Sequence, residues 1–195
     1  MSSDNFNQIP QPATLSAARV SLLPCSPNLA TDFFNLVRSN QNRLVDSFPI
    51  LLSKTKTIDS TRKFLESRSH EWEEGSIFGF MVKLLGTNEI IGYVTVKSVN
   101  WASRIAEVAY FIDKNHEGFG YVTESVKRVV IWSFLELKLK KLYVRIIPEN
   151  EASKQVAIRN GFKWKSRHDF EFRTSTGELV NLDYYFLDRK DFLKE

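Results

Sequence analysis

Apolar and polar positions along this chain of 195 residues follow two periods, and each period predicts one kind of element. In the middle of the chain apolar side chains recur at every second position, which is typical of strands with one buried face. A glycine-bearing turn at 86–88 divides the first two strands, so we expect a hairpin of 77–85 and 89–99. A third strand is expected over 104–113, with Glu107 on one of its faces.

A helical period, with apolar residues three or four positions apart, frames these strands. It predicts one helix over about 29–37 and another over 59–74 that Gly75 ends, with a short helical or irregular segment at 44–49 between them. A long helix over 121–137 follows the three strands. The predicted buried stripe of this long helix consists of Val122, Val126, Val129, Val130 and Phe134.

Strand and helix periods alternate again in the last third of the chain. A strand over 141–147 follows the long helix, so the strand, helix and next strand should form a right-handed parallel crossover. Asn150 is suited to cap a helix that runs to Asn160. Two further strands, 162–173 and 180–187, are expected after it.

These elements predict an α/β protein with a mixed sheet, in a single domain of residues 18–195 that starts with a short strand at 19–23. Residues 1–17 are polar and contain two prolines, and we expect them to form a tail. The sequence shows no internal repeat and no second domain boundary.

Composition narrows the classes of function. Hydrophobic residues make up 43% and charged residues 26%, as in ordinary globular proteins, and no apolar run approaches the roughly 20 residues of a membrane span. Cys25 is the only cysteine, which excludes an internal disulfide and a cysteine-based zinc site, and no metal is expected. Without a secretory signal pattern, the cytoplasm is the expected compartment. The net charge of +4 permits an anionic cofactor, whereas direct nucleic-acid binding is not expected.

The segment from Asp113 to Ser125 contains the strongest chemical signal. It leads from the end of a strand through Gly118-Phe119-Gly120 into the long helix. Glycines let the main chain approach a ligand closely, and the N–H groups and dipole of a helix start attract phosphate. A Gly-x-Gly turn alone is a weak indicator of phosphate binding, so the neighbouring segments decide its meaning.

Five segments supply that context, and their order and spacing resemble a known family. They are Ile91-Gly92, AEVAYFID at 106–113, EGFGYVTES at 117–125, NEAS at 150–153 and VAIRNGF at 156–162. With these segments the chain resembles the GNAT acetyltransferases, and within them the RimJ and RimL group of ribosomal-protein N-acetyltransferases. The resemblance covers about residues 19–192 and includes Asn40, Asn42, Leu44 and Pro49.

The resemblance implies the GNAT acyl-CoA N-acyltransferase fold and transfer of the acetyl group of acetyl-CoA to an amine. In this family the strand that corresponds to 104–113 splays from the strand that corresponds to 141–147, and the pantetheine of CoA lies between them. The cofactor-binding residues that the resemblance implies are Phe111, Ile112, Glu117, Gly118, Phe119, Gly120, Tyr121, Val122, Asn150 and Ser153.

Acyl transfer also requires polarisation of the thioester carbonyl, an acid for the thiolate and removal of a proton from the amine. Many GNAT proteins have a tyrosine acid where this chain has Ala157, so Ser153 is the candidate acid or polariser; alternatively, it only tightens the first turn of its helix. Glu107 is the candidate base, acting through water; alternatively, it is an exposed carboxylate that pairs with Arg104. Tyr110, on the opposite face of the strand, is expected in the core.

Two residues of the glycine turn depart from the family pattern, which usually has Gln or Arg at the position of Glu117 and often a cation at Phe119. The charge of Glu117 is expected to weaken CoA binding if its side chain faces the diphosphate. Together with Ala157, these departures leave open a non-catalytic CoA-binding module on the same scaffold. His116 lies near the turn without an evident partner in the sequence.

The acceptor is less well defined than the cofactor. Glu171 and Asp183 could contact the incoming amine, or they are ordinary polar residues of the sheet surface. A protein α-amine has a pKa of about 7.7 to 8.0 and needs less help from a base than a lysine amine, whose pKa is about 10.4. The preferred acceptor is therefore a protein N-terminus, with a ribosomal protein first, and the alternative is a small amine such as an antibiotic or polyamine. The oligomeric state does not follow from the sequence.

Overall fold

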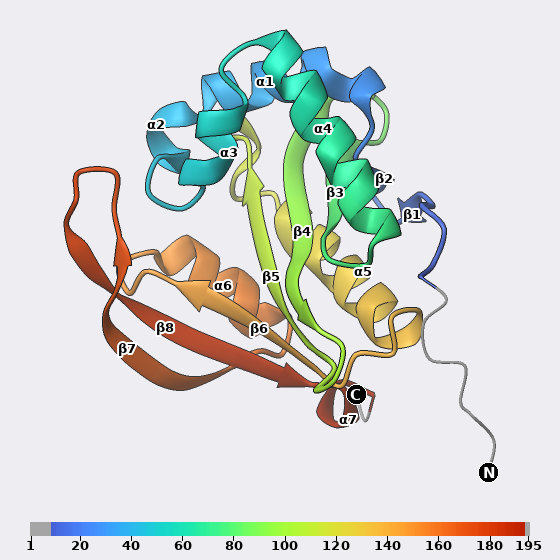
Figure 1. Ribbon diagram of the computed structural model, residues 1–195. Helices are drawn as coiled ribbons and strands as arrows, with labels where there is room; N and C mark the ends of the chain where they lie inside the picture. Colours follow the sequence, from blue (N-terminus) through green and yellow to red (C-terminus); the bar gives the residue numbers. More distant parts are fainter. Residues whose placement is uncertain (1–8, 194–195) are drawn as a thin grey trace.

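The computed structural model describes residues 9–193, which form one mixed sheet with helices on both faces (Figure 1). The strand order is β1-β2-β3-β4-β5-β6-β8-β7, and among these described strands only the β5–β6 pair is parallel. The strands are β1 Leu15–Ser16, β2 Val20–Pro24, β3 Phe78–Leu84, β4 Ile90–Asn100, β5 Ile105–Ile112, β6 Lys141–Ile146, β7 Lys163–Arg173 and β8 Leu179–Asp188.

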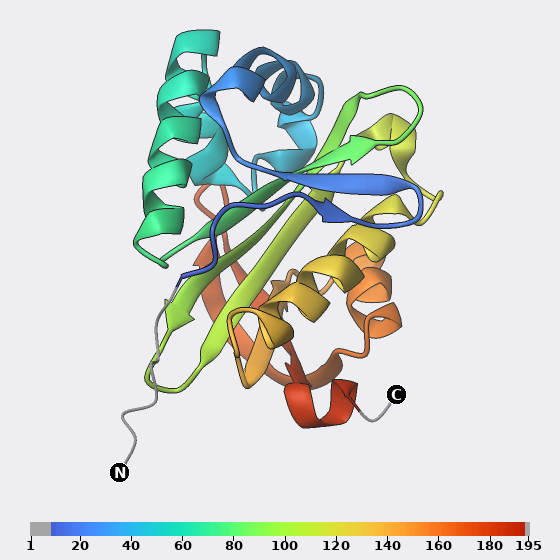
Figure 2. The same ribbon diagram turned by 90° about the vertical axis from the view of Figure 1, so that its right-hand side faces the viewer.

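Helices α1 to α4 lie on one side of the sheet and α5 and α6 on the other (Figure 2). Short 3-10 turns precede α1 and α5, at Pro27–Leu29 and Lys114–His116. The helices are α1 Ala30–Ser39, α2 Gln41–Leu44, α3 Pro49–Lys54, α4 Ile58–Glu73, α5 Tyr121–Leu135, α6 Glu151–Arg159 and α7 Arg189–Phe192. None of the helices described is long and apolar enough to cross a membrane.

The expected fold class is confirmed, and the pattern of apolar residues explains why. β3 and β4 form the expected hairpin, and β5, α5 and β6 form the expected parallel crossover. Four members of the predicted α5 stripe have no exposed surface, because their spacing puts them on one face of the helix against the sheet, whereas Val122 in the first turn is only partly buried. These four residues are Val126, Val129, Val130 and Phe134.

The described part of the N-terminal segment differs from the expected tail. β1 pairs with β2, and Leu15 is buried in the core. The indole N–H of Trp72 on α4 donates a hydrogen bond of 2.8 Å to the carbonyl oxygen of Pro10. A strand of two residues is too short to show a period, which is why the sequence pattern missed it. Residues 1–8 of the predicted tail lie outside the described residues.

β5 and β6 separate partway along their length, and this separation shapes the site. Ile105–Glu107 pair with Lys141–Tyr143. Beyond Glu107, β5 continues to Ile112 in register with β4 on its other edge. The edge of β5 that faces β6 is therefore not part of a strand ladder after Glu107, and the two strands form the sides of an opening in the sheet.

Candidate active site

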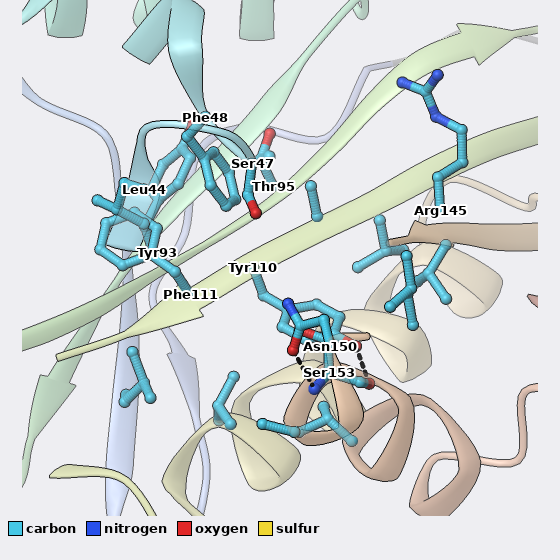
Figure 3. Close-up of a pocket in the computed structure, with 18 of the residues that line it drawn as sticks. Leu44, Ser47, Phe48, Tyr93, Thr95, Tyr110, Phe111, Arg145, Asn150 and Ser153 are labelled. Carbon is cyan, nitrogen blue, oxygen red and sulfur yellow. Dashed lines mark hydrogen bonds between the residues drawn. The ribbon is translucent and has the colours of Figure 1, made fainter. Parts of the chain in front are cut away.

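A cavity of about 670 Å³ occupies the opening between β5 and β6 (Figure 3). Its walls include six consecutive residues of β5. Alternate residues of a strand point to opposite faces of the sheet, so a cavity that touches all six extends to both faces. The residues on the α1–α4 side are Glu107, Ala109 and Phe111, and those on the α5–α6 side are Val108, Tyr110 and Ile112.

The start of α5 has the features of an anion site. Gly118 and Gly120 have φ angles of 79° and 81°, a left-handed conformation that glycine adopts without strain. Within residues 9–193 the side chains of Thr57 and Asn150 cap α4 and α6, whereas α5, like α1, α2, α3 and α7, has no side-chain cap. The first amides of α5 are therefore available to a ligand, and the helix dipole favours an anionic one.

The two residues that depart from the family pattern do not crowd this helix start. The carboxylate of Glu117 pairs with the guanidinium of Arg43 on α2. Phe119 is 60% exposed, stacks on Tyr121 with ring centroids 5.8 Å apart and does not line the cavity. Gly118, Gly120, Tyr121 and Val122 do line it. Arg43 lies between Asn42 and Leu44 of the family resemblance, but its contact with the turn joins residues 74 positions apart, and no spacing in the sequence indicates it.

Ser153 lies in the first turn of α6, at the other side of the opening (Figure 3). Its backbone N–H donates a 3.0 Å hydrogen bond to the side-chain oxygen of Asn150, which confirms Asn150 as the N-cap. The hydroxyl of Tyr110 donates a 2.9 Å hydrogen bond to the carbonyl oxygen of Ser153. Burial raises the pKa of Tyr110, so the phenol stays protonated and keeps this bond. Tyr110 packs against the core, as expected, but it also lines the cavity and fixes α6 to β5.

Glu107 lies on the opposite face and is buried, with 4% of its surface exposed. Its carboxylate is 3.3 Å from Nζ of Lys97 on β4, and it accepts a 3.1 Å hydrogen bond from Nη2 of Arg145 on β6. The expectation of an exposed carboxylate is therefore wrong. The contact with Arg145 bridges β5 and β6 just beyond their last paired residues. Strand alternation could have indicated that Arg145 lies on the same side of the sheet as Glu107. Arg145 follows Val144, so its side chain lies on the face opposite the apolar residues of β6.

The two candidate amine contacts, Glu171 and Asp183, do not line the cavity. Asp183 is buried and accepts hydrogen bonds of 2.8 and 2.9 Å from Arg167. These bonds hold the pKa of Asp183 below its usual value although burial opposes the shift. Glu171 accepts a hydrogen bond from the hydroxyl of Tyr184 and lies 3.9 Å from Nη1 of Arg145. The structure thus does not bring either carboxylate to the opening between β5 and β6.

The outer rim of the cavity joins two distant segments. Asp46, between α2 and α3, accepts hydrogen bonds of 3.0 Å from the backbone N–H and 2.8 Å from the hydroxyl of Ser175, in the turn between β7 and β8. These bonds hold the pKa of Asp46 below its usual value. Asp46, Ser47 and Phe48 line the cavity, so the contact connects one of its walls to the β7–β8 hairpin.

His116 has partners that the sequence did not reveal. Its Nδ1 lies 3.2 Å from Oδ2 of Asp113, and its Nε2 lies 3.7 Å from Glu89. Potential metal-ligating atoms of these three residues lie within 4.8 Å of one another. The contacts of the His116 imidazole with Asp113 and Glu89 account for the proximity of the three residues.

Comparison with known proteins agrees with this geometry. The sequence model of the acetyltransferase (GNAT) domain matches residues 19–163. A probable N-acetyltransferase of Bacillus subtilis, YjcK, is 31% identical over 54% of this chain, and the ribosomal-protein-serine acetyltransferase of Escherichia coli is 25% identical over 53%. The matched regions span 59% and 57% of these two relatives, so the chain covers somewhat more than half of their length.

A solved structure shows the same fold. RimJ of Mycobacterium smegmatis, in complex with CoA-disulfide, superimposes with a TM-score of 0.84 at 18% identity, covering 92% of this chain and 89% of that one. The family resemblance expected from the five sequence segments is confirmed, because the matching domain includes more than half of the chain. The protein belongs to the GNAT acetyltransferase family.

Proposed function

We propose that this protein transfers the acetyl group of acetyl-CoA to the N-terminal α-amine of a protein. The observation that carries the proposal is the cavity at the opening between β5 and β6. It connects the uncapped start of α5 on one face of the sheet with Glu107 on the other. An acetyl donor held at α5 and an amine that approaches from the opposite face can therefore meet between the two strands.

The residues present fit CoA. The amides from Gly118 to Val122 are suited to hold its diphosphate. At the edge of β5 where β6 has left the ladder, the main chain of Ile112 is suited to hydrogen-bond the amides of pantetheine as an added strand does, whereas the main chain of Phe111 faces β4. Acetyl-CoA then supplies the activated thioester.

The chemistry proposed is direct attack of the amine, without a covalent intermediate on the enzyme. The hydroxyl of Ser153 polarises the thioester carbonyl or protonates the leaving thiolate. Glu107 takes up the proton of the amine through a water molecule, and Lys97 and Arg145 hold its carboxylate at the opening. The alternative for Ser153 is a purely structural place in the first turn of α6.

The charges of the cavity favour an acceptor with a single amine over a polyamine. Binding of a polyamine, which carries several positive charges, would need several unpaired carboxylates. Basic Lys and Arg side chains outnumber acidic ones in its lining, and each acidic side chain there already has a partner. The acidic residues and their partners are Asp46 with Ser175, Glu107 with Lys97 and Arg145, and Glu117 with Arg43.

A ribosomal protein heads the acceptor candidates. The Escherichia coli relative is named a ribosomal-protein-serine acetyltransferase, and its similarity to this chain motivates the choice. About half or more of an α-amine is also neutral at pH 8, so it demands less than a lysine does of a base whose carboxylate already has two cationic partners.

The test is release of free CoA from acetyl-CoA with a panel of amines. The panel contains peptides with a free N-terminus, the same peptides with a blocked N-terminus and an internal lysine, and spermidine. We expect turnover with the free N-termini and at least about tenfold less with the other amines. Turnover with spermidine alone would reverse the choice of acceptor.

A non-catalytic CoA-binding module is the second candidate, and Ala157 motivates it. In many GNAT proteins this position holds a tyrosine acid, whereas Ala157 is fully buried in the core and offers no proton. Binding of acetyl-CoA without turnover on any amine would support this candidate. Turnover that disappears in Ser153→Ala would exclude it.

A further inference from the structure

We propose that Arg43 is a cofactor-binding residue that Glu117 holds in the free protein and that the diphosphate of CoA takes over on binding. The proposal rests on the CoA site described above and adds a contact from α2, outside the glycine turn. Arg43 and Glu117 both line the cavity, together with Gly118 and Gly120 of the turn. The guanidinium is thus placed beside the amides that are suited to hold the diphosphate.

The position of Arg43 does not depend on Glu117 alone. Its Nη1 donates a 3.0 Å hydrogen bond to Oδ1 of Asn40 and a 3.4 Å hydrogen bond to the carbonyl oxygen of Ile112, at the end of β5. Only the other nitrogen, Nη2, contacts Glu117. One side of the guanidinium is therefore fixed to the scaffold while the other can exchange its anionic partner.

Asn40 is the buried anchor of this arrangement, with 1% of its surface exposed. Its Oδ1 accepts a 3.0 Å hydrogen bond from the backbone N–H of Lys114, and its Nδ2 donates a 2.8 Å hydrogen bond to Asp113. Both residues belong to the segment that leads from β5 into the glycine turn. The start of α2 is therefore held against the cofactor turn before any ligand binds.

The ion pair between Arg43 and Glu117 is suited to open. Their side chains are 42% and 45% exposed, and ion pairs exposed to this degree contribute little to folding. A diphosphate carries more negative charge than one carboxylate, and the planar fork of a guanidinium matches phosphate oxygens well. Replacement of the Glu117 carboxylate by phosphate as the partner of Arg43 is therefore favourable. This replacement explains why an acidic residue can lie beside an anion site.

A simpler role for Arg43 makes a different prediction. If Arg43 only neutralises Glu117 and never contacts CoA, its removal weakens binding only while Glu117 is present. If CoA takes over the guanidinium, removal of Arg43 weakens binding whether residue 117 is Glu or Gln. A double-mutant cycle distinguishes the two roles.

The experiment is calorimetric titration of acetyl-CoA into the wild type, Arg43→Ala, Glu117→Gln and the double variant. We expect Arg43→Ala to raise Kd by about 10- to 100-fold in both backgrounds, and Glu117→Gln alone to lower Kd by about threefold or more. Arg38→Ala and Glu66→Gln are controls for the same changes of charge; both residues are exposed and away from the cavity, and Kd should stay within about twofold. Thermal unfolding of each variant checks that the fold is intact.

The outcomes separate this proposal from the proposed function. An Arg43→Ala effect that vanishes in the Glu117→Gln background overturns the exchange, as does an unchanged Kd in both backgrounds. In either case the wild type still binds acetyl-CoA and the proposed function stands. A wild type that does not bind acetyl-CoA at all overturns both.

Discussion

The two halves of the cavity are built in different ways. The half that we propose for the cofactor consists mainly of the backbone of one short segment, residues 118–122, and of the free edge of β5, with Arg43 as its proposed side-chain contact. The half that we propose for the acceptor consists of side chains from separate elements, such as Asp46 with Ser175, which are 129 positions apart in sequence. A site made of main-chain amides tolerates substitution of the neighbouring side chains. In a site made of long-range side-chain contacts, each substitution changes the groups that meet the ligand.

This difference explains how a GNAT protein can carry Glu117 and Phe119 in its phosphate turn. Phe119 is directed out of the cavity, Glu117 is paired with Arg43, and the amides keep their place. We expect less tolerance in the half proposed for the acceptor, because its side chains contact one another across long stretches of sequence.

The largest effect should come from a substitution in the glycine turn, in the half that we propose for the cofactor. Gly120→Asp places a carboxylate and a Cβ at the start of α5, with the Cβ 3.4 Å from Nη2 of Arg19. We expect at least about a 100-fold loss of acetyl-CoA affinity in calorimetry, because an anion then opposes the diphosphate. Gly86→Asp is the matched control, because Gly86 also has a left-handed φ, of 97°, and nothing lies near the added Cβ. Equal affinity of Gly120→Asp and Gly86→Asp would refute the phosphate-turn assignment.

The next largest effect, on the rate of turnover, should come from Ser153, which we propose to act between the cofactor and the acceptor. We expect Ser153→Ala to lower kcat by about 100-fold while the Kd for acetyl-CoA changes by less than about threefold, because the hydroxyl acts in the transition state. Steady-state kinetics and calorimetry measure the two quantities. A normal kcat would assign Ser153 only to the first turn of α6.

A smaller effect, on stability, should follow from breaking the ion pairs that Glu107 forms with Lys97 and Arg145. Arg145→Met leaves the buried carboxylate of Glu107 with Lys97 as its remaining partner among the contacts described here. We expect the free energy of unfolding, measured in urea, to fall by about 1–3 kcal/mol. Arg62→Met, which removes an exposed pair with Asp59, should change it by less than about 0.5 kcal/mol. Equal effects of the two substitutions would show that the cluster is not structurally important.

The smallest effect concerns the rim contact between Asp46 and Ser175. Because the folded pKa of Asp46 is lowered, the contact is fully present above the unfolded pKa of about 3.9 and is lost as pH falls through the folded pKa. The urea midpoints of wild type and Asp46→Ala should therefore differ by a small constant amount from pH 5 to 7 and converge below about pH 4. A difference that grows at acid pH would have the wrong sign for this contact.

The sequence predicted those parts of the molecule that are determined locally. The glycine turn, the Asn150 cap and the α5 stripe depend on residues within a few positions of one another. Five segments in order then sufficed for the family, and the fold class followed.

The contacts that were missed join residues far apart in the sequence; strand alternation indicates the face on which Arg145 lies but does not identify its partner. The pairing of Arg43 with Glu117 joins residues 74 positions apart, and the bridge from Glu107 to Arg145 joins residues 38 positions apart. Helix α3 has six residues and β1 has two, lengths too short for a period to be recognised. Glu171 and Asp183 were chosen from strand polarity alone, which does not record their pairing with Tyr184 and Arg167 outside the cavity lining.

The most direct test of the account is a calorimetric titration of the wild-type protein with acetyl-CoA. The central claim is that main-chain amides at the start of α5 make the cofactor site in spite of the acidic Glu117. We expect binding with a micromolar Kd. No detectable binding at high micromolar acetyl-CoA would contradict it, and would show that the side chains of the turn decide cofactor binding after all.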